Sequence, residues 1–120
     1  MPKVVMVVDD EPDIRDTVKD VLVDAGLKVV TAKDGQDCVD KVRTSPPDLI
    51  LLDILMPGLT TKEVIARLNK VKSPPIIFLT VVKLSEATKK NIIQGNMVDY
   101  VEKPFNNADL VKRVKKALGM

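Results

Sequence analysis

Five short apolar runs alternate with longer segments in which apolar residues recur about every four positions. The runs cover residues 4–8, 28–31, 49–52, 76–79 and 99–102. At least three of them, 4–8, 49–52 and 76–79, are apolar at successive positions, which predicts strands with both faces buried. Such strands are typical of a parallel sheet that is covered by helices on each side.

The segments between the runs have the apolar spacing of amphipathic helices. Their apolar positions are Ile14, Val18, Leu22 and Ala25 in the first, Cys38, Val39 and Val42 in the second, Val64, Ile65, Leu68 and Val71 in the third, and Leu110, Val111, Val114 and Leu118 in the last. The fourth segment, residues 85–94, has the weakest apolar content, so we expect it to be the least firmly packed helix.

Local signals mark the boundaries of these elements. Gly26 and Gly95 stand where C-terminal helix caps belong, Pro46-Pro47 and Pro74-Pro75 separate a helix from the next strand, and residues 60–63 fit a capping box. Five strand and helix units in strict alternation predict an α/β fold with right-handed crossovers.

Composition narrows the class of protein. At 120 residues, with 45% hydrophobic and 30% charged residues, the chain has the size and balance of one globular domain. No apolar stretch reaches the roughly 18 residues needed to cross a bilayer, and the first residues lack a signal-peptide pattern. We therefore expect a cytoplasmic protein without membrane contact.

The charge is balanced, with 19 basic and 17 acidic residues and a net charge of +2, and this does not favour nucleic-acid binding. The last helix carries a basic cluster, which we interpret as a solvated face with cations near the helix C-terminus. Its members are Lys112, Arg113, Lys115 and Lys116.

Histidine is absent and Cys38 is the only cysteine, which argues against a structural zinc site. Cys38 is predicted to be a small buried hydrophobic residue, and a single cysteine agrees with a reducing compartment. Any metal would be bound by oxygen.

Acidic residues follow two of the predicted strands directly. Asp9 and Asp10, with Glu11 after them, follow the first strand, and Asp53 follows the third. In an open parallel sheet, ligands bind beyond the carboxyl ends of the strands. If these two strands are neighbours, the carboxylates converge and repel one another, and a divalent cation such as Mg²⁺ relieves the repulsion.

Two more polar residues end strands at the same edge. Thr80 follows the fourth strand and offers a hydroxyl donor, and Lys103 follows the fifth and offers a positive charge. With a metal, these groups suit the transfer of a phosphoryl group. A carboxylate is the only plausible nucleophile in the set, which implies an aspartyl phosphate. Each residue alone could be an ordinary turn or loop residue, but together they mark the carboxyl ends of four strands.

In order and spacing, these motifs resemble the receiver domain of two-component response regulators, of the chemotaxis-regulator type. The residues that carry the resemblance are Val8-Asp9-Asp10-Glu11, Asp53 with Met56-Pro57-Gly58, Thr80, Tyr100 and Lys103-Pro104-Phe105. The resemblance covers essentially the whole chain. It implies a flavodoxin-like (βα)5 three-layer sandwich with a five-stranded parallel sheet of order 2-1-3-4-5, and a single receiver domain over residues 1–120.

The resemblance also implies roles at the acidic site. Asp53 would accept a phosphoryl group from the phosphohistidine of a sensor histidine kinase or phosphotransfer protein. Asp10 and Asp53 would ligate Mg²⁺ directly, Asp9 would act largely through water, and the main-chain carbonyl of Leu55 would be a further ligand.

Further roles follow from the same resemblance. Lys103 would pair first with the aspartate and then with the phosphoryl group, Thr80 would bind a phosphoryl oxygen, and Tyr100 would be the switch aromatic. Phosphorylation would change the partner preference of the face formed by residues 85–94, the fifth strand and the last helix. That face would bind a downstream effector or output domain, in a monomer or weak dimer that does not bind nucleic acid.

The chain departs from the family pattern at a few positions. Thr60-Thr61 replaces the usual Asp-Gly, which bears on kinase docking, and Val81 stands where a small residue is usual and is expected to narrow access to the site. Leu55 and Val82 flank the approach of a hydrolytic water and are apolar, so we expect slow loss of the phosphoryl group.

Two rival interpretations stay open at this point. An Asp-nucleophile phosphatase would commonly carry a second aspartate two residues after the nucleophile, where this chain has Leu55. A degenerate receiver that only binds partners would not need Asp10, Asp53, Thr80 and Lys103 together. Both arguments favour a phosphoacceptor module that is not an enzyme in its own right.

Overall fold

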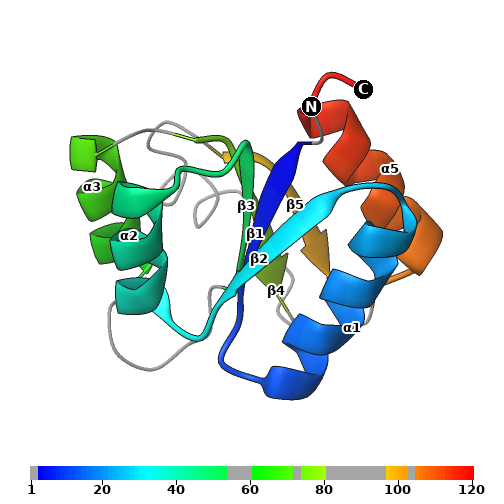
Figure 1. The fold of residues 1–120 in the computed structure, drawn as a ribbon, viewed down its shortest axis with the longest axis horizontal. Coiled ribbons are helices and arrows are strands. Elements are labelled where there is room, and N and C mark those ends of the chain that lie inside the picture. Colours follow the sequence, from blue (N-terminus) through cyan, green and yellow to red (C-terminus); the bar gives the residue numbers. More distant parts are fainter. Residues whose placement is uncertain (1–2, 54–60, 72–73, 81–96, 103–104) are drawn as a thin grey trace.

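The computed structural model describes residues 3–53, 61–71, 74–80, 97–102 and 105–120 (Figure 1). Within these ranges the chain forms five strands and four helices. In chain order they are β1 (Val4–Val8), α1 (Pro12–Asp24), β2 (Lys28–Ala32), α2 (Gly35–Thr44), β3 (Leu49–Asp53), α3 (Thr61–Val71), β4 (Ile76–Thr80), β5 (Met97–Glu102) and α5 (Asn107–Ala117). The helix expected over residues 85–94 lies outside the described residues.

The five strands form one sheet in the order β2-β1-β3-β4-β5, and all four strand pairs are parallel. This confirms the predicted order and makes β1 and β3 neighbours. Helices α2 and α3 cover one face of the sheet, and α1 and α5 cover the other (Figure 1). The fold is the predicted flavodoxin-like three-layer sandwich.

The central strands carry long apolar runs because each face of the sheet has its own core. Successive side chains of a strand point to opposite faces. Even-numbered residues such as Met6, Ile50 and Phe78 pack with α2 and α3, and odd-numbered residues such as Val7 and Leu51 pack with α1 and α5. All five of these side chains are fully buried, so a polar residue at any of these positions would lose its contacts with water.

Helix ends follow the expected chemistry where they are described. Helix α1 ends at a C-cap, Ala25, and the next residue, Gly26, has a φ of 90°, which L-residues with side chains rarely adopt. Helix α2 begins at Asp34, whose side chain accepts a hydrogen bond from the Asp37 main-chain N–H. Of the predicted boundary signals, Gly95 and Thr60 lie outside the described residues.

Four strand boundaries differ from the prediction. β2, β3 and β4 each extend one residue further, to Ala32, Asp53 and Thr80, and β5 begins at Met97 rather than at residue 99. The pairing of Asp53 with Leu79 and of Thr80 with Glu102 explains the extensions of β3 and β4, because the neighbouring strand continues the ladder past the apolar run. Among the described helices, none is both long enough and apolar enough to cross a membrane.

Candidate functional site

The register of the sheet brings the predicted acids together. Val8 of β1 pairs with Leu52 of β3, so the next residues along the two strands, Asp9 and Asp53, lie level with each other. Both continue the odd-numbered side of their strands, which faces α1 and α5. The main-chain N–H of Asp9 donates to the carbonyl oxygen of Ala32 at 3.2 Å, which continues the pairing of β1 with β2.

Three carboxylates meet at this edge. Asp9, Asp10 and Asp53 each offer an oxygen, and these oxygens all lie within 4.8 Å of one another. Asp9 is fully buried, Asp53 is 6% exposed and Asp10 is exposed. Two carboxylate charges 4.8 Å apart repel by about 3 kcal/mol at an effective dielectric constant of about 20. The cluster therefore favours a positive partner.

The donor set fits a hard divalent cation. Mg²⁺ binds oxygen at about 2.0–2.1 Å, so ligands on opposite sides of the ion stand about 4.2 Å apart. The three carboxylates each offer an oxygen within 4.8 Å of the others, a separation close to the span of such an ion with its ligands. Mg²⁺ also retains several waters, which suits a site with one buried and one exposed flank.

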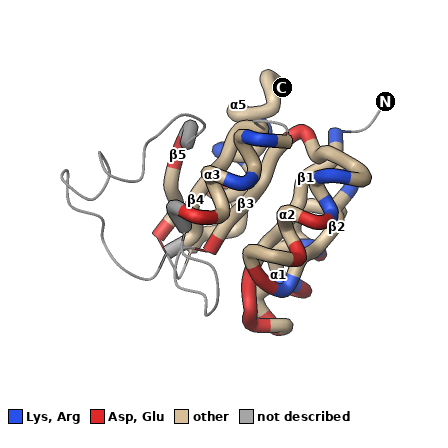
Figure 2. The backbone as a smooth tube through the Cα atoms, turned by 90° about the vertical axis from the view of Figure 1, so that its left-hand side faces the viewer, with Lys and Arg blue, Asp and Glu red and all other residues tan. Residues whose placement is uncertain are grey.

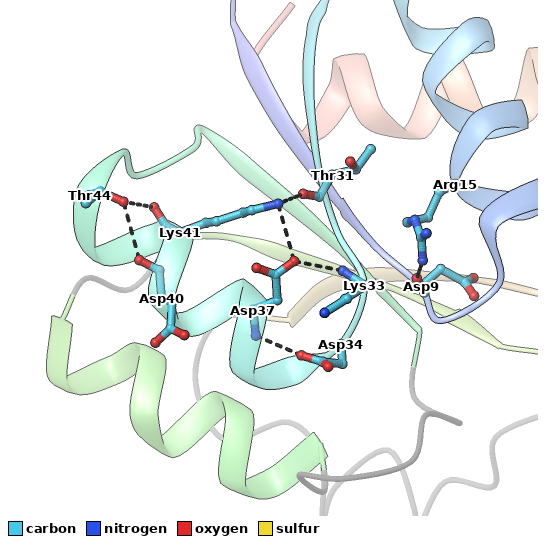
Figure 3. Close-up of polar contacts among 9 residues, drawn as sticks. All are labelled: Asp9, Arg15, Thr31, Lys33, Asp34, Asp37, Asp40, Lys41 and Thr44. Carbon is cyan, nitrogen blue, oxygen red and sulfur yellow. Dashed lines mark hydrogen bonds and ion pairs between the residues drawn. The ribbon is translucent and has the colours of Figure 1, made fainter.

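Asp9 is held at three atoms. Besides its N–H bond to Ala32, its Oδ1 accepts from the Glu11 N–H at 3.0 Å. Its carbonyl oxygen accepts from Arg15 Nη1 at 2.6 Å, and Figure 3 shows this bond. The Glu11 bond is an Asx turn, which a short acidic side chain makes with the backbone two residues on. The sequence prediction did not include Arg15. Its position in the first turn after the acids was the only signal, and it does not reveal which atom the side chain reaches.

Two further predicted site residues, Thr80 and Tyr100, lie on strands β4 and β5. Thr80 is the last residue of β4, and its backbone stands level with Glu102 of β5. Tyr100 of β5 is half-buried and packs against the core under α2 and α3. The predictions for Leu55, Val81, Val82 and Lys103 fall outside the described residues.

Tyr100 borders a pocket of about 290 Å³ between β5 and α5, whose other walls include Phe105 and Arg113. Arg113 ties the two elements together. Its Nη1 contacts Asp99 Oδ1 at 2.8 Å and the Tyr100 carbonyl oxygen at 3.3 Å, and its Nε contacts Asp109 Oδ2 at 2.9 Å. The hydrogen bond to Asp109 and the charge of Asp99 raise the pKa of Arg113. One member of the basic cluster on α5 is thus committed to ion pairs.

A second polar network fixes the start of α2 beside the β2 end. Asp37 Oδ2 accepts from the Lys33 N–H at 3.0 Å and pairs with Lys41 Nζ at 3.3 Å, and Lys41 also donates to the Thr31 carbonyl oxygen (Figure 3). The pKa of Asp37 is lowered overall. Partial burial acts to raise it, but the hydrogen bond from Lys33 and the charge of Lys41 together have the larger, opposite effect. This network was not predicted from the sequence.

Charge is distributed unevenly around the site. In Figure 2, several acidic backbone positions lie toward the lower side of the view and basic positions lie on α3 above them. The acidic cluster lies at the carboxyl ends of the two neighbouring strands β1 and β3. A flavodoxin-like sandwich belongs to the class of open α/β proteins, in which ligands bind at the carboxyl ends of the strands, where this cluster lies.

Comparison with known proteins identifies the family within this class. Residues 5–115 match the family model described as response regulator receiver domain. The chain belongs to this family.

Solved structures agree with this assignment. Chemotaxis protein CheY4 from Vibrio cholerae is 31% identical, with 98% of this chain and 99% of that chain covered and a TM-score of 0.83. A CheY-like receiver domain protein from Methanospirillum hungatei is 34% identical, with 97% and 94% covered and a TM-score of 0.85.

A third structure bears on the metal. The receiver domain of sensor histidine kinase PA1611 from Pseudomonas aeruginosa is 26% identical, with all of both chains covered and a TM-score of 0.86. It has a magnesium ion coordinated in its active site cleft.

Proposed function

We propose that this chain is the phosphoacceptor module of a two-component phosphorelay, and that Asp53 receives a phosphoryl group from the phosphohistidine of a sensor histidine kinase or phosphotransfer protein. The observation that carries the proposal is the convergence of Asp9, Asp10 and Asp53 within 4.8 Å at the end of the central strands. Membership of the receiver family supports it. We take residues 1–120 as one receiver domain.

The surroundings of the three acids support Asp53 as the nucleophile. Asp9 is fully buried and its Oδ1 accepts from the Glu11 N–H, so it is suited to hold a metal-bound water rather than to attack. Asp10 follows it in the turn before α1 and is exposed. Asp53 ends a strand that is buried on both faces, which fixes its backbone, and its side chain is slightly exposed.

In the proposed reaction, a carboxylate oxygen of Asp53 attacks the phosphorus of the phosphohistidine. A phosphorus–oxygen bond forms, the phosphorus–nitrogen bond breaks, and the imidazole nitrogen leaves with the electron pair. Mg²⁺ held by Asp10 and Asp53, by Asp9 through water and by the Leu55 carbonyl would neutralise charge on the phosphoryl oxygens. Lys103 would add a positive charge beside them.

Phosphorylation is proposed to act as a switch. Thr80 would hydrogen-bond the phosphoryl group, and Tyr100 would turn inward when Thr80 moves. The half-buried position of Tyr100 beside a pocket of about 290 Å³ supports this role. The face built from residues 85–94, β5 and α5 would then bind a downstream effector protein or output domain.

Further properties belong to the same proposal. Apolar Leu55 and Val82 would slow hydrolysis, so the module stores the phosphoryl group rather than turning it over. It would work in the cytoplasm beside its kinase, as a monomer or weak dimer, without binding nucleic acid.

The proposal is tested by incubating the protein with acetyl phosphate and Mg²⁺ and measuring the intact mass. We expect one added phosphoryl group, no addition after chelation of Mg²⁺, and none on Asp53→Asn. Asp16→Asn, which removes an exposed carboxylate of α1, is the matched control and should be phosphorylated like the wild type. An adduct on Asp53→Asn, or none on the wild type, would remove the proposal and favour a receiver that only binds partners.

A further inference from the structure

Arg15 connects helix α1 to the turn that carries two of the three acids. It lies in the first turn of α1, half-buried, and its Nη1 donates to the carbonyl oxygen of Asp9 at 2.6 Å (Figure 3). The acceptor is a main-chain carbonyl and not a carboxylate. The contact therefore holds the backbone of the turn.

The hydrogen bonds of this segment form a closed chain. The Arg15 N–H donates to the Glu11 carbonyl oxygen at 3.1 Å, and the Glu11 N–H donates to Asp9 Oδ1 at 3.0 Å. The side chain of Arg15 then returns to the Asp9 carbonyl. Asp10 lies between the two held residues, so its backbone is fixed from both sides although its carboxylate is exposed.

We propose that Arg15 is a positioning residue for the divalent cation, which holds the turn of residues 9–11 so that Asp9 and Asp10 meet Asp53. The proposal rests on the proposed function, because it assumes that the cluster binds Mg²⁺. Groups that orient metal ligands from outside the coordination shell typically change affinity 10- to 100-fold when they are removed. Loss of Arg15 also leaves the carbonyl of fully buried Asp9 without this donor.

The sign of the effect separates positioning from simple electrostatics. A guanidinium close to a cation site repels Mg²⁺, so removal of its charge alone would tighten binding. Removal of a positioning contact weakens binding instead. The two explanations therefore predict opposite changes in the dissociation constant of Mg²⁺.

The test is a Mg²⁺ titration of the full chain followed by amide NMR chemical shifts, with thermal unfolding in the absence of Mg²⁺ to verify that each variant is folded. Arg15→Met should raise the dissociation constant about 10-fold. Lys19→Met removes the same charge from an exposed position one turn further along α1 and should leave the constant unchanged. Arg15→Lys retains a donor and a charge and should bind with intermediate affinity.

Two results would overturn the proposal. In the first, Arg15→Met binds Mg²⁺ as tightly as the wild type or more tightly. In the second, Arg15→Lys binds Mg²⁺ no more tightly than Arg15→Met. If methionine at this position prevents folding, Arg15→Gln is neutral and too short to reach the carbonyl, and it gives the same test. A wild-type protein that does not bind Mg²⁺ would overturn the proposed function as well, whereas normal wild-type binding with an unchanged variant would overturn the role of Arg15 alone.

Discussion

At the scale of single residues, burial determines the chemistry of the one cysteine. Cys38 is fully buried on α2, and its burial, with the negative charge of Asp37 next to it, raises the pKa of the thiol to about 12. The thiolate is the reactive form, so the native thiol is inert at neutral pH. This agrees with the prediction that Cys38 is a small hydrophobic core residue.

Alkylation measures this directly. We expect iodoacetamide at pH 8 to modify native Cys38 far more slowly than the same residue in denaturant, because both access and thiolate are missing. Intact mass over time gives the two rates. Equal rates in native and denatured protein would contradict a buried thiol with a raised pKa.

The stability of the protein should respond to the same group at high pH. The pKa of Cys38 is higher in the folded state than in the unfolded chain, so its contribution to stability is complete below the unfolded value of about 9 and is lost as pH rises toward 12. The sign follows because only the unfolded chain gains a thiolate in that interval.

At the scale of elements, helix α2 depends on a cap made by two aspartates. Asp34 accepts from the Asp37 N–H at 2.8 Å, and Asp37 in turn accepts from the Lys33 N–H. This is a variant of the capping box, in which each side chain satisfies a main-chain donor of the other end. The arrangement also attaches α2 to the end of β2.

Replacement of the cap should weaken the fold by a predictable amount. Asp34→Ala is expected to lower the free energy of unfolding by about 1 kcal/mol. Asp34→Asn retains a side-chain oxygen and should lower the free energy of unfolding by only a few tenths of that amount. Urea unfolding gives both values. Equal losses for the two variants would show that the carboxylate charge, and not the cap, stabilises the helix.

The junction of β5 and α5 depends on Arg113. The side chains of Arg113, Asp99 and Asp109 are 39%, 30% and 48% exposed, so solvent screens their pairing strongly. We expect Arg113→Met to destabilise the protein by about 1 kcal/mol, the upper range for exposed pairs, and the loss to shrink in high salt. Lys112→Met on the same helix is the matched control and should have almost no effect in urea unfolding. A similar loss for both variants would mean that the ion pairs contribute nothing.

At the scale of the whole molecule, the sequence was sufficient for the architecture. The strand at residues 49–52 and the helix that contains Cys38 and Val42 could be predicted from periodicity. A strand buried on both faces is apolar at successive positions, whereas a helix buried on one face is apolar about every four positions. The order of the strands came from the resemblance, and the structure confirms it. The start of β5 at Met97 was missed although Met97 and Val98 are apolar, because the pairing of β4 with β5 shifts register between Ile76 and Ile77, and the sequence pattern does not reveal such an irregularity.

The site was predicted in part for a related reason. Asp9, Asp10 and Asp53 could be placed at one edge because parallel strands end together. The burial of Asp9, the hydrogen bonds that hold its backbone and the contact with Arg15 could not be predicted, since they depend on how α1 returns over the sheet. The sequence shows where a residue stands along a helix or strand, whereas the contact of Arg15 with Asp9, six residues earlier, depends on how the elements pack.

The most direct test of the central claim identifies which carboxylate carries the phosphoryl group. Sodium borohydride reduces an aspartyl phosphate to an alcohol and releases phosphate, which marks the residue permanently. After reaction with acetyl phosphate and Mg²⁺, peptide mapping by mass spectrometry should find the reduced residue at position 53 and leave Asp9 and Asp10 unchanged. Reduction at Asp9 or Asp10, or none at position 53, would contradict the assignment of Asp53 as the phosphoacceptor.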